Sequence, residues 1–286
     1  MFRLLSQIKK YRAAYINWII IVMNLALKKE VSGKMRDGAT IPSAFLVVQL
    51  KELVFNGMEP RYDEGQDKIT FKYNGRDVSL KGVSRNGDIC GVFVNEEYSF
   101  LNVDGKYVID VGMNIGDSSI YFALNGAKKV IAYEPFKKVF MLAKENIDGM
   151  NLSDKIFAVN GGVGTENPNI IIPDLLETTD ISMKESESGI KVPVYSLEDT
   201  IESCPSTEIM LKMDCEGCEY EVFSKFKSEN LIKIKKIVME YHHGYKSLKT
   251  MLEMNGFKCR VTKPKKVKTI HKSMHTIGYL FAERVE

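Results

Sequence analysis

The 286-residue sequence has little of what marks several specialised classes of protein. Its five cysteines are an odd number scattered along a long chain, which excludes the disulfide framework of a small secreted domain and favours a reducing, cytoplasmic location. A net charge of +3 is too small to indicate a nucleic-acid partner by itself. The longest apolar stretch, residues 15–27, falls short of the roughly 20 residues that a membrane-spanning helix needs.

That apolar stretch, "YINWIIIVMNLAL", is followed by "KKEVSGKMRDG", which offers no small-residue cleavage site for a secretory signal. Basic residues flank it on both sides: Arg3, Lys9, Lys10, Arg12, Lys28 and Lys29. We interpret residues 1–30 as a helical segment that packs on the domain or on a second subunit of a homo-oligomer. Contact of residues 15–27 with a membrane surface is the alternative.

Residues 31–103 contain short β-prone runs separated by turn signals. In "KITFKYNGRDVSLKG" the Asn74–Gly75 pair predicts a hairpin turn, and "GVFVNEEYSFLNV" is a further β-prone run. This part of the chain is predicted to be a small β-rich accessory region.

Residues 104–286 alternate apolar strands with amphipathic helices. The predicted strands include "YVIDVG", "KVIAYEP", "IFAVNGGVG", "IMLKMDCEG" and "KIVMEYHH", and a last strand ends the chain. Such alternation predicts an α/β fold with a doubly wound, mostly parallel sheet. Ligands of these sheets bind beyond the carboxyl ends of the strands.

Neither common phosphate-binding loop follows the first of these strands. The turn "DVGMNIGDS" contains Asp110, Gly112, Asn114 and Gly116. A Walker loop would need Gly-Lys-Ser/Thr, and a dinucleotide fingerprint would have glycine where Asn114 stands. The turn therefore permits close approach of a ligand but supplies no phosphate cradle, which also disfavours a nicotinamide dehydrogenase.

Glu134 ends the next strand, 18 residues beyond Gly116. An acid at that place can accept hydrogen bonds from both hydroxyls of a ribose. A ribose-binding acid without a phosphate cradle indicates an adenosine ligand that lacks phosphates, and S-adenosylmethionine fits that description. The alternative is a structural glycine turn beside a solvated Glu134.

Three segments together resemble the FkbM family of S-adenosylmethionine-dependent methyltransferases: "VIDVGMNIGDSSIYFALNGAKKVIAYEP", "LKMDCEGCEYEVF" and "IVMEYHHGYKSLKTMLEMNGF". The resemblance covers about residues 100–257. It implies a Rossmann-like sheet and O-methylation of hydroxyls on natural products or sugars. The second segment matches the family pattern K-x-D-x-E-G-x-E at Lys212, Asp214, Glu216, Gly217 and Glu219.

The resemblance also assigns a cofactor site. Glu134 would bind the ribose, residues 160–163 would approach the adenine, and the loop after the first strand would hold the rest. The residues concerned are Asp110, Gly112, Asn114, Gly116, Glu134, Asn160, Gly161 and Gly162.

Catalysis is predicted where "KMDCEGCE" leaves its strand. Asp214 and Glu216 are carboxylates that can remove and orient a hydroxyl proton, and together they can bind a divalent cation, although no metal ligand is predicted. His242 is a further candidate base. Because neighbouring side chains of a strand point to opposite faces, His242 and His243 cannot both face the site. Lys212 is expected to pair with a neighbouring acid.

The remaining histidine and cysteine motifs are interpreted as structural. "CEGC" lacks the two further ligands of a zinc site, so Cys215 and Cys218 are read as packed thiols, with a redox or metal role as the alternative. His271 and His275 would share a face only on a helix, whereas a loop or strand is expected there.

We therefore predict an S-adenosylmethionine-dependent O-methyltransferase that acts on a sugar, a glycan or another small hydroxyl acceptor. The alternative is an RNA (tRNA or rRNA) methyltransferase that uses the basic cluster from Lys263 to Lys272. A cofactor-binding protein without turnover is a third reading.

Overall fold

The computed structural model describes residues 2–84, 86–164, 169–172, 189–225, 228–268 and 274–285. The chain divides into two compact units, the first formed by Met1–Glu97 with Asp148–Met150 and the second by Tyr98–Ile147 with Asn151–Glu286. Each unit is described by itself.

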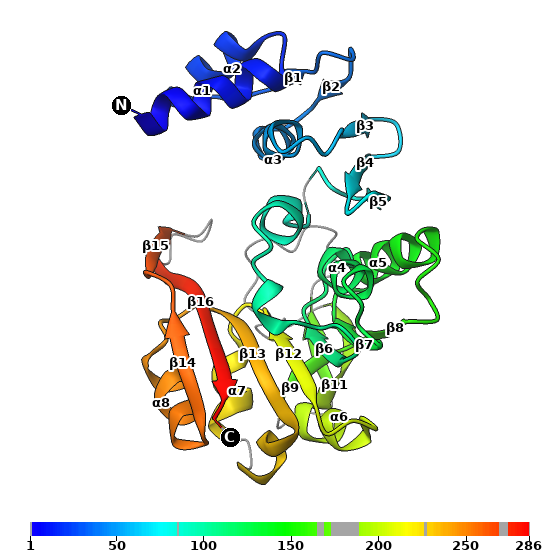
Figure 1. Ribbon diagram of the computed structural model, residues 1–286, viewed down its shortest axis with the longest axis vertical. Coiled ribbons are helices and arrows are strands. Elements are labelled where there is room, and N and C mark those ends of the chain that lie inside the picture. Colours follow the sequence, from blue (N-terminus) through cyan, green and yellow to red (C-terminus); the bar gives the residue numbers. More distant parts are fainter. Residues whose placement is uncertain are drawn as a thin grey trace. The chain divides into compact units, whose positions relative to one another are not determined.

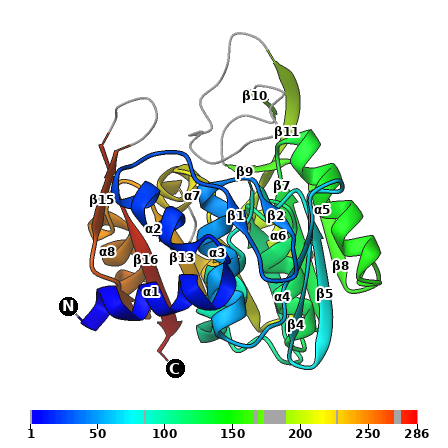
Figure 2. The same ribbon diagram turned by 90° about the horizontal axis from the view of Figure 1, so that it is seen from above.

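The first unit begins with helices. Helix α1 (Phe2–Ala14) packs against α2 (Trp18–Ala26) and α3 (Ala44–Phe55), as Figures 1 and 2 show. A short pair of strands, β1 (Gly33–Lys34) and β2 (Thr40–Ile41), precedes α3. No helix among the described residues is long and apolar enough to cross a membrane.

A three-stranded antiparallel sheet follows, made of β3 (Arg61–Asp63), β4 (Lys68–Tyr73) and β5 (Arg76–Lys81). The predicted hairpin between β4 and β5 is confirmed. Asn74 and Gly75 both have positive φ, at 48° and 75°, as a tight hairpin turn requires.

The second predicted β-run of this region was wrong. "GVFVNEEYSFLNV" forms no strand: Cys90–Val94 is a single π-helical turn and Ser99–Leu101 a 3₁₀ turn. The β-prone side chains are buried by tertiary packing instead, since Phe93 makes edge-to-face contacts with Phe71 and Tyr73 of the hairpin. Packing has overridden local propensity here.

The second unit contains an eight-stranded sheet (Figure 1). Five strands run parallel: β6 (Tyr107–Val111), β7 (Lys129–Glu134), β8 (Ile156–Asn160), β12 (Ile209–Met213) and β13 (Ile234–Tyr241). Strands β14 (Phe257–Val261), β15 (Lys265–Lys268) and β16 (Met274–Arg284) complete it in antiparallel pairing. The predicted doubly wound, mostly parallel sheet is confirmed.

Helices cover both faces of this sheet. Buried side chains of α6 (Leu197–Ser203), α7 (Cys218–Lys225) and α8 (Lys246–Met254) form one core with Ile109 and Leu211. Helices α4 (Asp117–Leu124) and α5 (Lys137–Gly149) contribute their buried side chains outside that core. A 3₁₀ helix, Ser228–Lys233, leads into β13.

The chain leaves the large sheet directly after β8. Strand β9 (Gly162–Gly164) pairs with β11 (Ile190–Ser196), which also pairs with β10 (Asn169–Ile172). The predicted single strand "IFAVNGGVG" is therefore two strands in two sheets.

The strand order is β14-β16-β13-β12-β6-β7-β8. From β6 the chain proceeds outward through β7 to β8, and it then returns to the other side of β6 with β12. The ends of β6 and β12 therefore form the topological switch point, where ligands of such sheets bind.

Candidate active site

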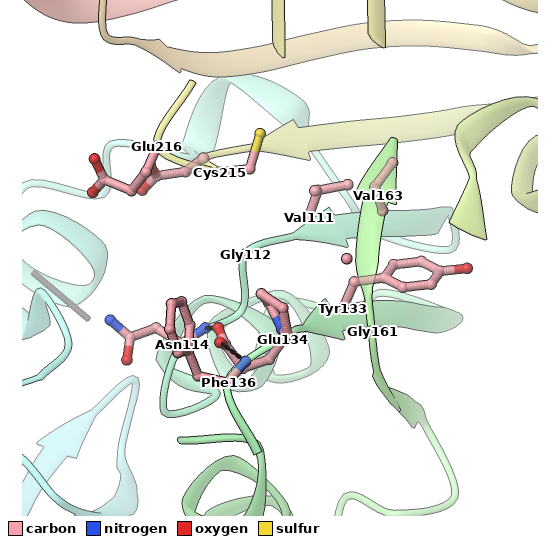
Figure 3. A pocket seen from close by; sticks show the side chains of 13 residues that line it. Val111, Gly112, Asn114, Tyr133, Glu134, Phe136, Gly161, Val163, Cys215 and Glu216 are labelled. Atoms are coloured by element: carbon pink, nitrogen blue, oxygen red, sulfur yellow. Dashed lines mark hydrogen bonds between the residues drawn. The ribbon is translucent and has the colours of Figure 1, made fainter. Parts of the chain in front are cut away.

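A pocket lies at this switch point, with about 660 Å³ of empty space when the adjoining open solvent is included (Figure 3). The lining comes from the ends of β6, β7, β9 and β12: Val111, Gly112, Asn114, Tyr133, Glu134, Pro135, Phe136, Gly161, Gly162, Val163, Asp214, Cys215 and Glu216. Seven residues assigned from the sequence are among them, whereas Asp110, Gly116, Asn160 and His242 are not.

Glu134 is held rigidly at the pocket wall. Its carboxyl oxygens accept hydrogen bonds from the backbone N–H of Phe136 at 2.9 Å and of Asn114 at 3.1 Å, drawn as dashed lines in Figure 3. Burial raises the pKa of Glu134 to about 8, against the lowering effect of these two bonds and of the Lys212 charge. The carboxyl is thus oriented before any ligand arrives.

The loop after β6 approaches β12 very closely. Gly112 has φ of 79°, and a Cβ atom there would lie 1.8 Å from the backbone oxygen of Asp214. In the same loop Asn114 has φ of 50°. Its Oδ1 atom is buried and has no hydrogen-bond partner within the described part of the chain. An acceptor without a partner in a pocket wall fits a ligand that brings a donor.

A buried ion pair, Asp110 and Lys212, lies next to this loop and holds its backbone. They are partners in the register of the parallel strands β6 and β12, and Lys212 Nζ lies 3.1 Å from Asp110 Oδ1. Lys212 also donates to the carbonyls of Val111 and Gly112, while Ser118 and Ser119 donate to Asp110 at 2.6 Å. The predicted pairing of Lys212 with an acid is confirmed. Asp110 contacts Lys212 and the start of α4, and it does not line the pocket.

Gly116 and Asn160 also lie behind the lining. Gly116 adopts φ of 88° at the start of α4, a conformation that glycine reaches without strain. The side-chain amide of Asn160 donates to the carbonyls of Glu134 at 2.9 Å and Pro135 at 3.1 Å. Both residues fix the backbone that carries the lining.

Gly161 forms part of the opposite wall. A Cβ atom at Gly161 would lie 2.5 Å from the ring of Tyr195 in β11, and that ring stands beside Tyr133 with 5.6 Å between centroids. Phe136 is 5% exposed and faces the same pocket. The pocket lining therefore combines glycine backbone at Gly161 with the aromatic side chains of Tyr133 and Phe136, which suits a planar ring.

Three carboxylates converge on His242 beside the pocket. His242 Nδ1 lies 2.8 Å from Glu219 Oε1, and its Nε2 lies 3.2 Å from Glu216 Oε2 and 3.9 Å from Asp214 Oδ1. Burial alone would lower the pKa of His242, but the bond to Glu219 and the charges of all three carboxylates raise it to about 10. Burial raises the pKa of Asp214.

Glu219 was given no role from the sequence, although it closes the matched pattern. The structure buries it completely, with Oε2 accepting from the backbone N–H of Gly217 at 3.0 Å. It is the second residue of α7, directly after the loop that carries Asp214 and Glu216. The available signal was its place in the matched pattern, because an acid in the first turn of a helix is common and Glu221 is a second one here. His242 is buried and His243 is exposed, in keeping with the prediction that the two neighbouring side chains do not both face the site.

Cys215 and Cys218 are joined by a disulfide, here called the rim disulfide. The interpretation as packed thiols was therefore wrong. Only Glu216 and Gly217 lie between the two cysteines. With φ of 55° and 120°, these two residues form a tight turn that brings the sulfurs together. Cys90, Cys204 and Cys259 are free.

Asp214, Glu240 and His242 each offer a ligand atom, and these atoms lie within 4.8 Å of one another, a spacing compatible with one divalent cation. No metal ligand was predicted from the sequence. His275 lies in strand β16, in agreement with the loop or strand expected there, and His271 lies outside the described residues. In the basic cluster, β15 pairs with β16 in antiparallel register, and Lys265 and Lys266 are exposed.

The fold and the pocket define a Rossmann-like α/β protein with a small-molecule site at the switch point of its sheet. Residues 110–274, more than half of the chain, match the family model described as the methyltransferase FkbM domain. The protein belongs to this methyltransferase family, which confirms the resemblance seen in the sequence. Family membership and the Rossmann-like sheet support S-adenosylmethionine as the cofactor.

Two curated relatives come from viruses. Uncharacterized protein 158B of Sulfolobus islandicus rod-shaped virus 1 is 30% identical over 132 residues, 46% of this chain and 60% of the relative. Uncharacterized protein 65 of Sulfolobus islandicus filamentous virus is 35% identical over 78 residues, 27% of this chain and 49% of the relative. The chain thus spans between half and three fifths of the length of these relatives.

Similar solved structures include a tRNA m1G37 methyltransferase from M. jannaschii (15% identity, TM-score 0.42, 78% of this chain and 59% of that one). TrmK from M. capricolum, in complex with S-adenosylhomocysteine, has 12% identity and a TM-score of 0.40 over 67% of this chain and 68% of that one. Both likenesses concern the fold alone, and neither carries an argument about substrate.

Proposed function

We propose that this protein is an S-adenosylmethionine-dependent methyltransferase that methylates a hydroxyl oxygen on a sugar, a glycan or another small acceptor. The observation that carries the proposal is the continuity of the pocket. One lining joins Glu134 and the glycine loop, which suit an adenosine, to Asp214 and Glu216, which suit a reacting hydroxyl.

The residues present fit the cofactor. The fixed carboxyl of Glu134 can accept the ribose hydroxyls, the buried Oδ1 of Asn114 can accept one further donor, and the Gly161 wall can receive the adenine. Gly112 keeps the loop thin enough for the ligand to approach β12. When bound, S-adenosylmethionine supplies the methyl group and retains the electron pair of the broken carbon–sulfur bond.

Asp214 is the proposed general base. It lines the pocket, and burial raises its pKa, so its carboxylate is a stronger base than an ordinary aspartate. The hydroxyl proton would pass to this carboxylate as the oxygen bonds to the methyl carbon. A positioned base of this kind typically contributes about 10²–10⁴-fold to the rate.

His242 and Glu216 are proposed to position this base. With a pKa of about 10, His242 carries a proton at neutral pH and is a cation among the three carboxylates, not a proton acceptor. Its Nε2–H faces Glu216 and Asp214, and Glu219 fixes the ring from the other side. The role of a neutral His242 base, expected from the sequence, is therefore not part of the proposal.

The test is transfer of radiolabelled methyl from S-adenosylmethionine to a panel of sugars, glycans and nucleotide-sugars, with total tRNA and rRNA in parallel. We expect label on a small acceptor and none on an analogue whose hydroxyl is replaced by hydrogen. Asp214→Asn should lose about 10²–10⁴-fold in kcat and still bind S-adenosylhomocysteine. Label on RNA with steep salt dependence would replace the small acceptor by RNA.

A further inference from the structure

Helix α2 exposes a continuous apolar stripe. Ile19, Ile20 and Met23 of α2 are 55%, 59% and 58% exposed, and they are flanked by Ile16 in the turn before the helix and Leu27 at its C-cap, which are 55% and 61% exposed. Isolated exposed apolar residues are ordinary in proteins, but side chains gathered on one helix face indicate an interaction surface.

The helix cannot turn this stripe inward, because its other face is already anchored. Ile21 is completely buried. At the start of α2 the side chain of Asn17 bonds to the carbonyl of Ser32 and to the backbone N–H of Lys34. Just before it, Tyr15 is buried and donates to the carbonyl of Val47 at 2.9 Å. The fold therefore holds α2 with the stripe outward.

Basic residues flank the stripe in the sequence, and the first acid, Glu30, is exposed directly after Lys29. The first 29 residues contain no Asp or Glu, and their basic residues lie on both sides of the stripe in the sequence: Arg3, Lys9, Lys10, Arg12, Lys28 and Lys29. Lys9, Arg12, Lys28 and Lys29 are exposed. Lys10 is the exception, since it pairs with Glu52 at 2.6 Å.

We propose that this stripe, residues 16, 19, 20, 23 and 27, docks the protein on an anionic lipid surface. An apolar helix face flanked by cations is the pattern of a helix that lies in the membrane interface. With nine residues, α2 is too short to span, so it would lie in the surface plane. Charge complementarity selects lipid over a second copy of this chain, whose own stripe would bring the same cations. Each basic residue near such a surface is expected to add about fivefold to the affinity.

The test is co-sedimentation of the full chain with vesicles of phosphatidylcholine alone and of phosphatidylcholine mixed equally with phosphatidylglycerol. We expect binding to the anionic vesicles that weakens as salt rises. Ile20→Asn with Met23→Asn should lose at least tenfold in binding, and Lys28→Glu with Lys29→Glu should do the same on anionic vesicles only. These side chains are exposed, so folding, followed by circular dichroism, should be unchanged.

Met254→Asn is the matched control, because Met254 is 81% exposed on α8, away from α2 in the sequence. It should bind vesicles like the unaltered protein. Absence of vesicle binding at every lipid concentration would overturn the proposal, as would binding that survives the double Asn variant. A dimer in solution that the double Asn variant dissociates, without vesicle binding, would show that a second copy covers the stripe instead.

Discussion

Replacing Glu134 by glutamine should weaken cofactor binding about 10- to 100-fold. The two carboxyl oxygens each accept one backbone N–H, from Phe136 and from Asn114. Glutamine keeps one acceptor and turns the other into an NH₂ group, which opposes a backbone donor and cannot accept a ribose hydroxyl. A hydrogen bond to a charged group contributes about 1.5–3 kcal/mol, and 1.4 kcal/mol is a factor of ten in affinity.

The same site makes binding depend on pH. Because burial raises the pKa of Glu134 to about 8, the carboxyl of the free protein is largely protonated at neutral pH. Ribose hydroxyls bond best to the ionised form, so binding should release a proton. Affinity should therefore rise by up to about tenfold per pH unit below 8 and level off above it. Without ligand, this carboxyl binds its proton more tightly in the folded state than in the unfolded state. Its contribution to the free energy of unfolding therefore falls as pH rises from about 4.3 to 8.

The assay is calorimetric titration with S-adenosylhomocysteine between pH 6 and pH 9, in two buffers of different ionisation enthalpy so that proton release is measured directly. Glu134→Gln should bind weakly and without pH dependence. Glu208→Gln, at an exposed acid paired with Lys106, is the control and should bind like the unaltered protein. Equal affinity of Glu134→Gln and the unaltered protein across this range would refute the ribose assignment.

Three further outcomes are expected. Gly112→Ala should unfold at lower temperature and lose cofactor binding, because its Cβ would lie 1.8 Å from a backbone oxygen. Gly105→Ala, with a similar φ of 68° and open space around it, is the control and should lose only about 1 kcal/mol in free energy of unfolding. Equal losses in the two variants would show that the φ angle alone matters. Glu219→Gln should lower the pKa of His242 from about 10, followed by NMR, with cofactor binding unchanged; a pKa that stays near 10 would assign the effect to the other carboxylates. Reduction of the rim disulfide should lower the free energy of unfolding, measured in urea, by about 2 kcal/mol. In a variant with serine at both cysteines, the free energy of unfolding should not change when reductant is added.

The central sheet was predictable because its strands are buried on both faces. "YVIDVG", "KVIAYEP" and "IMLKMDCEG" are short apolar runs followed by turn residues, and each forms a strand close to the predicted bounds. The residues at the carboxyl ends of these strands could be placed in one site, since parallel strands end at one edge. For the same reason Glu134 and Asp214 line one pocket.

The features that were not predicted from the sequence depend on contacts between distant segments or on local backbone conformation. The π-helical turn at Cys90 is stabilised by packing on the hairpin, and the N–H and Sγ of Cys90 bond to Gln49, 41 residues away. The buried pair of Glu219 and His242 joins residues 23 apart, and neither position is unusual in its local pattern. The closing of the rim disulfide depends on the conformation of Glu216 and Gly217, which no spacing rule fixes.

The wall behind Gly161 has a practical consequence. Because β9 leaves the large sheet and pairs with β11, the ring of Tyr195, which belongs to no sequence motif and is 41% exposed, lies against Gly161 at the proposed adenine site. Replacing Tyr195 by alanine would open a hole at that wall without touching Glu134 or Asp214. The variant could then accept methyl donors with an enlarged base that the natural pocket rejects, so that its products could be labelled selectively in a mixture of methyltransferases.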